Sequence, residues 1–210
     1  MILYDYFRSS AAYRVRIALN LKQVEHERVQ VHLVKGDQRE ADYLARNPQG
    51  LVPALDIGGG VVLTQSLAII EWLDATYPAP RLIPAEPLAR ARAMAQALTI
   101  AADIHPIDNL RVLRRLKSQF GADEDATGEW YRHWIALGFA ALETMAGSGA
   151  GPFLGGEAPG IADVMLVPQM FNARRYDLPL DAYPRLVAAD AAARALEPFA
   201  AASPDRSAPE

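Results

Sequence analysis

The stretch Arg8-Ser9-Ser10-Ala11-Ala12-Tyr13-Arg14-Val15-Arg16-Ile17-Ala18-Leu19 decides the fold, and it directly follows the apolar start Met1-Ile2-Leu3-Tyr4. A short strand pattern ends, two serines follow, and apolar side chains then recur at helical spacing. Serine is favoured at a helix start because its oxygen accepts a hydrogen bond from one of the first N–H groups. The same helix end carries partial positive charge and can hold an anion such as a thiolate. Because the chain contains no cysteine, such a thiolate would come from another molecule.

Composition excludes several classes of protein. With 210 residues, 51% of them hydrophobic and 22% charged, the chain can form one large or two small domains with an apolar core. The net charge of −4 argues against nonspecific binding to nucleic acid. The absence of cysteine excludes a disulfide framework and a cysteine nucleophile, and the four histidines are too scattered to predict a metal site. Neither a signal peptide nor a membrane span is predicted, so we expect a cytoplasmic protein.

Residues 1–77 alternate between strand and helix patterns. Strands are predicted over residues 2–4, 27–31, 51–57 and 61–63, and helices over residues 10–21, within 35–45 and from Ser66. Three consecutive glycines, residues 58–60, separate the last two strands and are typical of a hairpin. The resulting order, βαβαββα, predicts an α/β layer arrangement.

Prolines between residues 78 and 87 interrupt this pattern and mark the expected domain boundary. Beyond Leu88 the periodicity is helical, with predicted helices over residues 88–119, 125–146, 161–173 and 184–201. We therefore expect an α/β domain over residues 1–80 and an all-α domain over residues 86–204. The polar residues from Ser203 onward are expected to fray.

Two further segments of the first domain favour a ligand-binding role. Pro53 lies inside a strand pattern, and proline cannot donate to a strand ladder, so this position is expected at an edge or a break. The preceding peptide bond can be cis, which would expose the backbone N–H and C=O of Val52 to an extended peptide. Ser66 is expected as the N-cap of the next helix, whose end can bind a carboxylate. An ordinary edge strand and ordinary caps also explain each segment alone. Together they indicate a site for a short acidic peptide that carries a thiol.

These segments resemble the zeta class of the glutathione transferases. Residues 1–77 resemble the thioredoxin-like domain of that family and the all-α remainder its second domain, so the resemblance covers nearly the whole chain. The motifs are Ser9-Ser10 with Arg14-Val15-Arg16-Ile17-Ala18-Leu19, Asn47-Pro48, Val52-Pro53, Gln65-Ser66 and Ile104-His105-Pro106-Ile107-Asp108-Asn109.

Two positions depart from the pattern of the family. Ala11 stands where the zeta class usually has cysteine, which places the reacting thiol on glutathione alone. Gly160 stands where serine or threonine usually caps a helix, and we expect Asp163 to reach back to the free N–H groups there.

The resemblance implies a set of glutathione contacts. The sulfur is expected near Ser9 and Ser10, the glycyl end near Gln38, and the γ-glutamyl carboxylate near Gln65 and Ser66. His105 and Asn109, which are four residues apart and would share a helix face, approach from the helical domain. The implied glutathione-binding residues are Ser9, Ser10, Ala11, Ala12, Tyr13, Arg14, Gln38, Gln49, Val52, Pro53, Gln65, Ser66, His105, Asn109 and Arg111.

The resemblance also implies an activity: glutathione-dependent cis–trans isomerisation of a maleyl diketo acid to its fumaryl isomer, in a homodimer that needs no metal. Arg8, Arg111 and Arg175 are the implied clamps for the substrate carboxylates, and with Ser9 and Ser10 they form the expected catalytic set. Two alternatives stay open. One is a general glutathione transferase that acts on electrophiles or small haloacids, and the other is a binding protein with the same fold.

Overall fold

The structure, a computed structural model, describes residues 1–147 and 150–209 and divides into two compact units. Unit 1 comprises Met1–Arg81 together with Ala195–Glu210, and unit 2 comprises Leu82–Arg194. The chain passes from one unit to the other between Arg81 and Leu82, within the proline-containing segment of the sequence. The C-terminal end differs from the expected division, because residues 195–210 cluster with the α/β domain.

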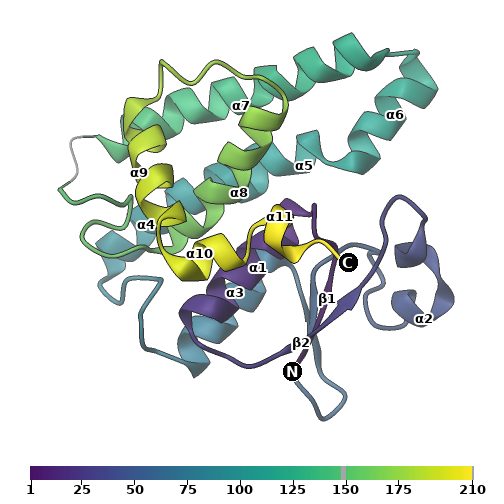
Figure 1. Ribbon diagram of the computed structural model, residues 1–210, viewed down its shortest axis with the longest axis horizontal. Coiled ribbons are helices and arrows are strands. Elements are labelled where there is room, and N and C mark those ends of the chain that lie inside the picture. The colour runs from purple at the N-terminus through teal and green to yellow at the C-terminus, as the bar shows by residue number, and fades with distance from the viewer. Residues whose placement is uncertain (148–149, 210) are drawn as a thin grey trace. The chain divides into compact units, whose positions relative to one another are not determined.

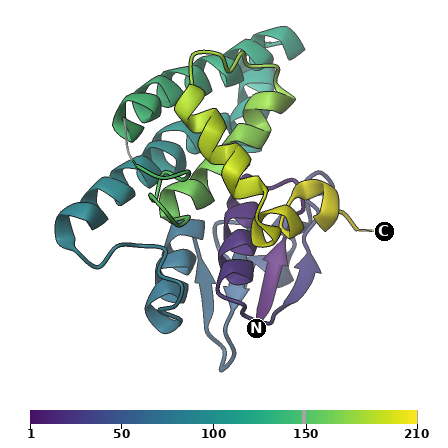
Figure 2. The ribbon, with the colours of Figure 1, turned by 60° about the vertical axis from the view of Figure 1, so that its left-hand side comes forward.

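Unit 1 is built on a mixed sheet of four strands in the order β2-β1-β3-β4. The central strand β1 (Ile2–Asp5) is parallel to β2 (Glu27–Gln30) and antiparallel to β3 (Ala54–Asp56), which pairs with β4 (Val62–Thr64). The strands lie side by side in Figure 2. The predicted order of elements is confirmed, although β3 begins only at Ala54, because Pro53 has no N–H to donate.

The helices of unit 1 are α1 (Ser10–Leu21), the short elements η1 (Asp37–Arg39) and α2 (Ala41–Leu44), and α3 (Ser66–Thr76). Helix α1 packs against α3 and contributes apolar side chains to the core. The fully buried core residues of this unit include Leu3, Val15, Ile17, Leu19, Leu55, Ile69, Ile70 and Leu73. Because α1 and α3 pack against each other, the N-terminal ends of both helices have fixed positions in unit 1.

The C-terminal residues form two short helices, α10 (Glu197–Ala201) and α11 (Pro204–Ser207), and α10 lies beside α1 (Figure 1). The predicted helix over residues 184–201 is therefore interrupted after Arg194. The prediction that the chain frays from Ser203 is wrong. Ser203 caps α11 by accepting the Arg206 N–H at 3.4 Å, and Ser207 is buried. The polar composition of residues 203–209 did not predict an ordered segment, because one of their hydrogen-bond partners lies far away in the sequence.

In the described residues of unit 2 the regular elements are helices, as predicted, apart from one isolated β-bridge between Phe153 and Gly156. Its elements are α4 (Pro87–Leu98), the π-helical turn η2 (Thr99–Ile104), α5 (His105–Asp108), α6 (Leu110–Phe120), α7 (Glu124–Ala146), α8 (Ile161–Arg175) and α9 (Pro184–Arg194). Helix α8 is buried along nearly its whole length and packs against α4 and α9. The predicted reach of Asp163 is confirmed, since its carboxylate accepts the N–H groups of Leu154, Gly155 and Gly160 at 2.7, 3.0 and 2.8 Å.

The single helix predicted over residues 88–119 is divided at Asn109. There the backbone is extended, with φ −75° and ψ 161°, and the side chain begins a new helix.

None of the helices in the described part of the chain combines the length and the apolar character that crossing a bilayer requires. In the same residues, no group of three or more histidine, aspartate or glutamate side chains is placed to hold a metal ion.

Candidate active site

The start of α1 carries the two serines. Ser9 has an extended backbone and is the N-cap, and its Oγ accepts the Ala12 N–H at 3.3 Å. Ser10 is the first residue of the helix and is buried. The Ser9 oxygen serves the cap while its O–H remains a donor, because a hydroxyl both donates and accepts. Hydroxyl donors and the positive end of α1 therefore lie together, which is an arrangement that stabilises an anion.

The residues that follow the serines point mostly into unit 1. Ala11 is half-buried and Ala12 fully buried. The Tyr13 hydroxyl donates to the Phe199 carbonyl at 3.5 Å, and Arg14 is buried with its Nη1 donating to Ser66 Oγ at 3.4 Å. Arg14 therefore links the first half of α1 to the start of α3. The sequence predicted that two anion-binding helix ends lie close together, and this hydrogen bond connects the two helices near those ends.

The start of α3 differs from the expectation for Ser66. Gln65, rather than Ser66, is the N-cap, and its side chain makes no capping hydrogen bond. Ser66 is the first helical residue and is buried. Gln65 has φ +68°, which is uncommon for a residue with a side chain, and its Nε2 donates to Gln49 Oε1 at 2.7 Å. The first turn of α3 therefore begins without a capping hydrogen bond from the Gln65 side chain, and a helix end of this kind suits a carboxylate.

The loop before β3 presents an open backbone edge. The Val52–Pro53 peptide bond is cis, and within residues 1–147 and 150–209 nothing hydrogen bonds to the N–H or C=O of Val52. The loop is anchored one residue earlier, where the Leu51 carbonyl accepts the Tyr43 hydroxyl at 2.6 Å and Asn47 Nδ2 at 2.7 Å. Burial raises the pKa of Tyr43 to about 12, so its hydroxyl remains a donor. An extended peptide can therefore pair with Val52.

Gln38, which was expected to bind the glycyl end of the ligand, lies buried in η1. Its Nε2 donates to the Leu33 carbonyl at 3.4 Å, and in the described part of the chain its Oε1 has no partner. The amide presents an acceptor, whereas a carboxylate requires a donor. Rotating the amide by half a turn supplies that donor and gives up the hydrogen bond to the Leu33 carbonyl.

Three arginines were expected to clamp substrate, and all three are exposed. The guanidinium of Arg8 lies 5.1 Å from the Phe7 ring centroid, and that of Arg175 lies 5.0 Å from the Tyr176 ring centroid. Among the described residues none of these arginines forms a salt bridge. Arg8 belongs to unit 1, and Arg111 and Arg175 belong to unit 2. Each keeps a charge that an anionic ligand can neutralise.

The expected shared face of His105 and Asn109 does not exist, because the helix ends between them. Asn109 instead caps α6: its Oδ1 accepts the N–H groups of Arg111 and Val112 at 3.1 and 3.3 Å. Its Nδ2 donates to the Pro106 carbonyl at 2.8 Å. The amide that was expected to contact glutathione is therefore engaged in local structure. His105 keeps its place at the start of α5.

Asp108 is a buried carboxyl group that the sequence did not reveal. It is 2% exposed, and in the described part of the chain neither carboxyl oxygen has a hydrogen-bond partner. Burial raises the pKa of Asp108 to about 8. The only signal in the sequence is an acidic residue that follows Ile104-His105-Pro106-Ile107, and such a residue is as often a solvated helix end.

Models of one family match both units. The glutathione S-transferase N-terminal domain matches residues 8–76, and the glutathione S-transferase C-terminal domain matches residues 128–188. A probable maleylacetoacetate isomerase of Vibrio cholerae is 51% identical over 98% of this chain and 96% of its own length.

Solved structures agree with these matches. The holo structure of a maleylpyruvate isomerase, a bacterial glutathione S-transferase of the zeta class, has a TM-score of 0.95 at 46% identity over 98% of each chain. A maleylacetoacetate isomerase from Methylobacterium extorquens AM1, with bound malonate and glutathione, has a TM-score of 0.95 at 40% identity over 100% of each chain. The fold and the family predicted from the sequence are confirmed. The chain belongs to the glutathione S-transferase family, in the zeta class that includes the maleylacetoacetate and maleylpyruvate isomerases.

Proposed function

We propose that this chain is a glutathione-dependent cis–trans isomerase that converts a maleyl diketo acid, maleylacetoacetate or maleylpyruvate, to its fumaryl isomer. The observation that carries the proposal is the donor set of unit 1. The uncapped start of α3, the open edge at Val52 and the hydroxyls at the start of α1 suit a carboxylate, a peptide backbone and a thiolate, respectively. Those are the groups that glutathione carries. A homodimer and a cytoplasmic location belong to the same proposal, supported by the family resemblance.

When bound, glutathione supplies a thiolate whose reversible addition to the maleyl double bond removes the barrier to rotation. The first task of the chain is to keep that sulfur ionised. Lowering a thiol pKa by about two units requires about 2.7 kcal/mol. A hydrogen bond to a charged acceptor contributes about 1.5–3 kcal/mol, and a helix N-terminus about 0.3–1 kcal/mol. One serine hydroxyl and the start of α1 are therefore sufficient without an added base.

The second task is to hold a dianionic substrate. Arg8, Arg111 and Arg175 suit this role because guanidinium groups bind carboxylates through two parallel hydrogen bonds. The same cations favour negative charge that develops on the substrate oxygen during the reaction. The aromatic rings of Phe7 and Tyr176 restrict the positions of Arg8 and Arg175.

A direct test measures the loss of diketo-acid absorbance for maleylacetoacetate and maleylpyruvate, with and without glutathione. We expect turnover only in the presence of glutathione, with the concentration of free thiol unchanged at the end. Full turnover without glutathione would refute the proposal. Consumption of one thiol for each substrate molecule would favour the general transferase, and binding to immobilised glutathione without turnover would favour a binding protein.

Arg8→Ala and Arg175→Ala are each expected to raise KM for the maleyl substrate about tenfold or more, with a smaller change in kcat. Loss of a charge-assisted hydrogen bond of about 1.5–3 kcal/mol gives an effect of this size. Arg115→Ala, which removes an exposed arginine of α6 outside the proposed site, is the matched control. KM and kcat are measured by initial-rate kinetics. An unchanged KM in both Arg8→Ala and Arg175→Ala would show that these arginines do not bind the substrate carboxylates.

A further inference from the structure

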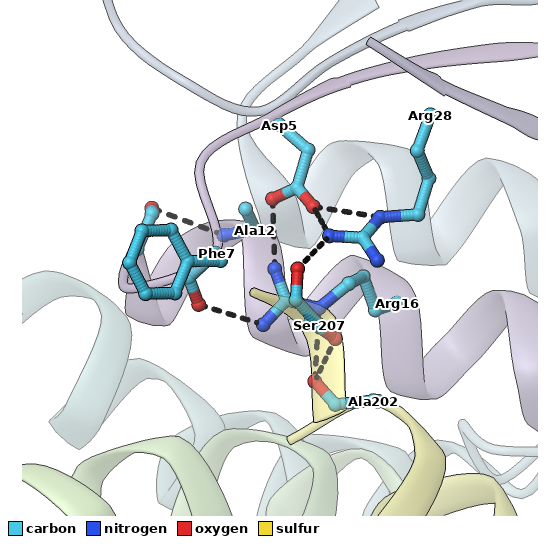
Figure 3. A network of polar contacts seen from close by, with 8 residues as sticks. Asp5, Phe7, Ala12, Arg16, Arg28, Ala202 and Ser207 are labelled. Atoms are coloured by element: carbon cyan, nitrogen blue, oxygen red, sulfur yellow. Dashed lines mark hydrogen bonds and ion pairs between the residues drawn. The ribbon is translucent and has the colours of Figure 1, made fainter. Parts of the chain in front are cut away.

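Asp5, the last residue of β1, is fully buried between two arginines (Figure 3). Its Oδ1 accepts Arg16 Nη1 at 2.7 Å, and its Oδ2 accepts Arg28 Nη2 and Nε at 2.6 and 3.0 Å. The Arg16 side chain is 2% exposed, and its guanidinium carbon also lies 5.2 Å from the Tyr13 ring centroid. Arginine rarely occupies the interior unless it is paired, so this cluster is a specific arrangement rather than a solvated surface.

Arg16 also donates to two backbone carbonyls. Nη2 donates to the Phe7 carbonyl at 3.1 Å, and Nε donates to the Ala202 carbonyl at 2.9 Å. The Phe7 carbonyl belongs to the turn that leads into α1, which the Ser9 N–H closes by donating to the Tyr6 carbonyl at 2.8 Å. One guanidinium therefore fixes the turn before Ser9 and the C-terminal segment to the same carboxylate.

The C-terminal segment is held to this cluster at several points. Arg28 Nη2 donates to the Ser207 carbonyl at 3.1 Å, and Ser207 Oγ donates to the Ala202 carbonyl at 3.2 Å. Asn20, near the end of α1, donates through Nδ2 to the Pro198 carbonyl at 2.9 Å. The Ala202 carbonyl that receives Arg16 is therefore itself held in place by α11.

We propose that Arg16 is a positioning residue for the glutathione sulfur, and that residues 195–207 form part of the support that it uses. The inference rests on the proposed function. Ser9 begins α1 immediately after the anchored turn, so a displacement of the Phe7 carbonyl displaces the hydroxyls of Ser9 and Ser10. A misplacement of about 1 Å at a reacting group lowers a rate about 100-fold. Arg16 touches neither glutathione nor substrate in this account, and it acts through the position of the two serines.

Arg16→Lys tests the proposal because lysine retains the positive charge beside Asp5 but lacks the fork that reaches two carbonyls. We expect the pKa of the bound glutathione thiol, followed by thiolate absorbance, to rise by about one unit. At neutral pH kcat/KM should fall about threefold and recover at higher pH, because thiolate formation is the step affected. Arg28→Lys is the comparison variant, since Arg28 binds the same carboxylate and the Ser207 carbonyl but not Phe7. The thiol pKa should rise less in Arg28→Lys than in Arg16→Lys.

Thermal unfolding separates positioning from stability. A folded Arg16→Lys with the thiol pKa and pH profile of the parent overturns the inference, and so does an equal shift in Arg28→Lys. If Arg16→Lys does not fold, the thiol pKa is measured in Ser207→Ala instead. This variant removes the hydrogen bond from Ser207 Oγ to the Ala202 carbonyl and leaves the one from Arg16. A smaller rise in the thiol pKa supports the inference, and no rise overturns it. The parent must first show glutathione-dependent turnover, so failure of the proposed function is recognised separately.

Discussion

Replacing Ser10 by alanine is expected to lower kcat/KM for the isomerisation about 10- to 100-fold. The Ser10 hydroxyl lies at the first position of α1, where a hydrogen bond to a thiolate contributes about 1.5–3 kcal/mol. Without it the bound thiol should titrate about one to two units higher, so less thiolate is present at neutral pH. The pH dependence of kcat/KM and the thiolate absorbance of the glutathione complex measure the two effects.

Two companion variants make this test specific. Ser9→Ala removes the cap that Ala12 uses and should reduce the stability of the protein by about 1 kcal/mol, whatever its effect on the sulfur. Comparing thiol pKa values in the two serine variants therefore identifies the nearer hydroxyl. Ala11→Cys should leave activity within about twofold of the parent, because the reacting thiol belongs to glutathione. Parental activity and an unshifted thiol pKa in Ser10→Ala would contradict the thiolate role.

Asp108→Asn is expected to stabilise the protein at high pH by about 2–4 kcal/mol, less than the whole pKa shift implies, because the amide is buried at the same unpartnered position. The ordinary pKa of this carboxyl is 3.8, and burial raises it to about 8 in the folded chain. Below pH 4 both states are protonated and the group contributes no pH dependence. Between pH 4 and pH 8 the Asp108 carboxyl is ionised in the unfolded chain but protonated in the folded chain, so the free energy of unfolding falls as the pH rises. Above pH 8 both states are ionised and the decrease in stability is complete. Asparagine avoids this decrease because its amide does not ionise.

Urea unfolding of the parent and the variant at pH 5, 7 and 9 provides the measurement. The difference between the two midpoints should widen steadily with pH, with no change in the slope of the transition. Asp103→Asn, a change at an exposed aspartate of η2, is the matched control and should leave the pH dependence unaltered. A parent whose stability is flat from pH 5 to 8 would show that the Asp108 carboxyl has a partner in solution.

Features that depend on near neighbours in the chain were predictable from the sequence. The strand before Ser9, the helix after it and the hairpin at the three glycines follow from periodicity, capping and turn chemistry, all of which act over a few residues. Asp163 belongs to the same group, because its carboxylate reaches N–H groups only three to nine residues away. The family resemblance depends on the order of such local motifs.

Predictions failed where two local options have similar energy. Ser66 and Gln65 could each precede α3 as the N-cap, and in the structure Gln65 does so, with φ +68° and a side chain that donates to Gln49. Similarly, Asn109 could continue a helix or start a new one, and its side chain starts α6. A difference of about 1 kcal/mol separates such alternatives, and packing decides between them.

The sequence by itself determined the order of strands and helices, the serines at the start of α1 and the membership of a thiol-dependent family. Only the tertiary structure decided that the polar C-terminal residues are ordered and that Arg16 joins them to the turn before Ser9. The physical reason is distance along the chain. Arg16 and Arg28 donate to the carbonyls of Ala202 and Ser207, respectively, and a backbone carbonyl carries no signature of its residue type. Contacts of this kind exist only once the chain has folded.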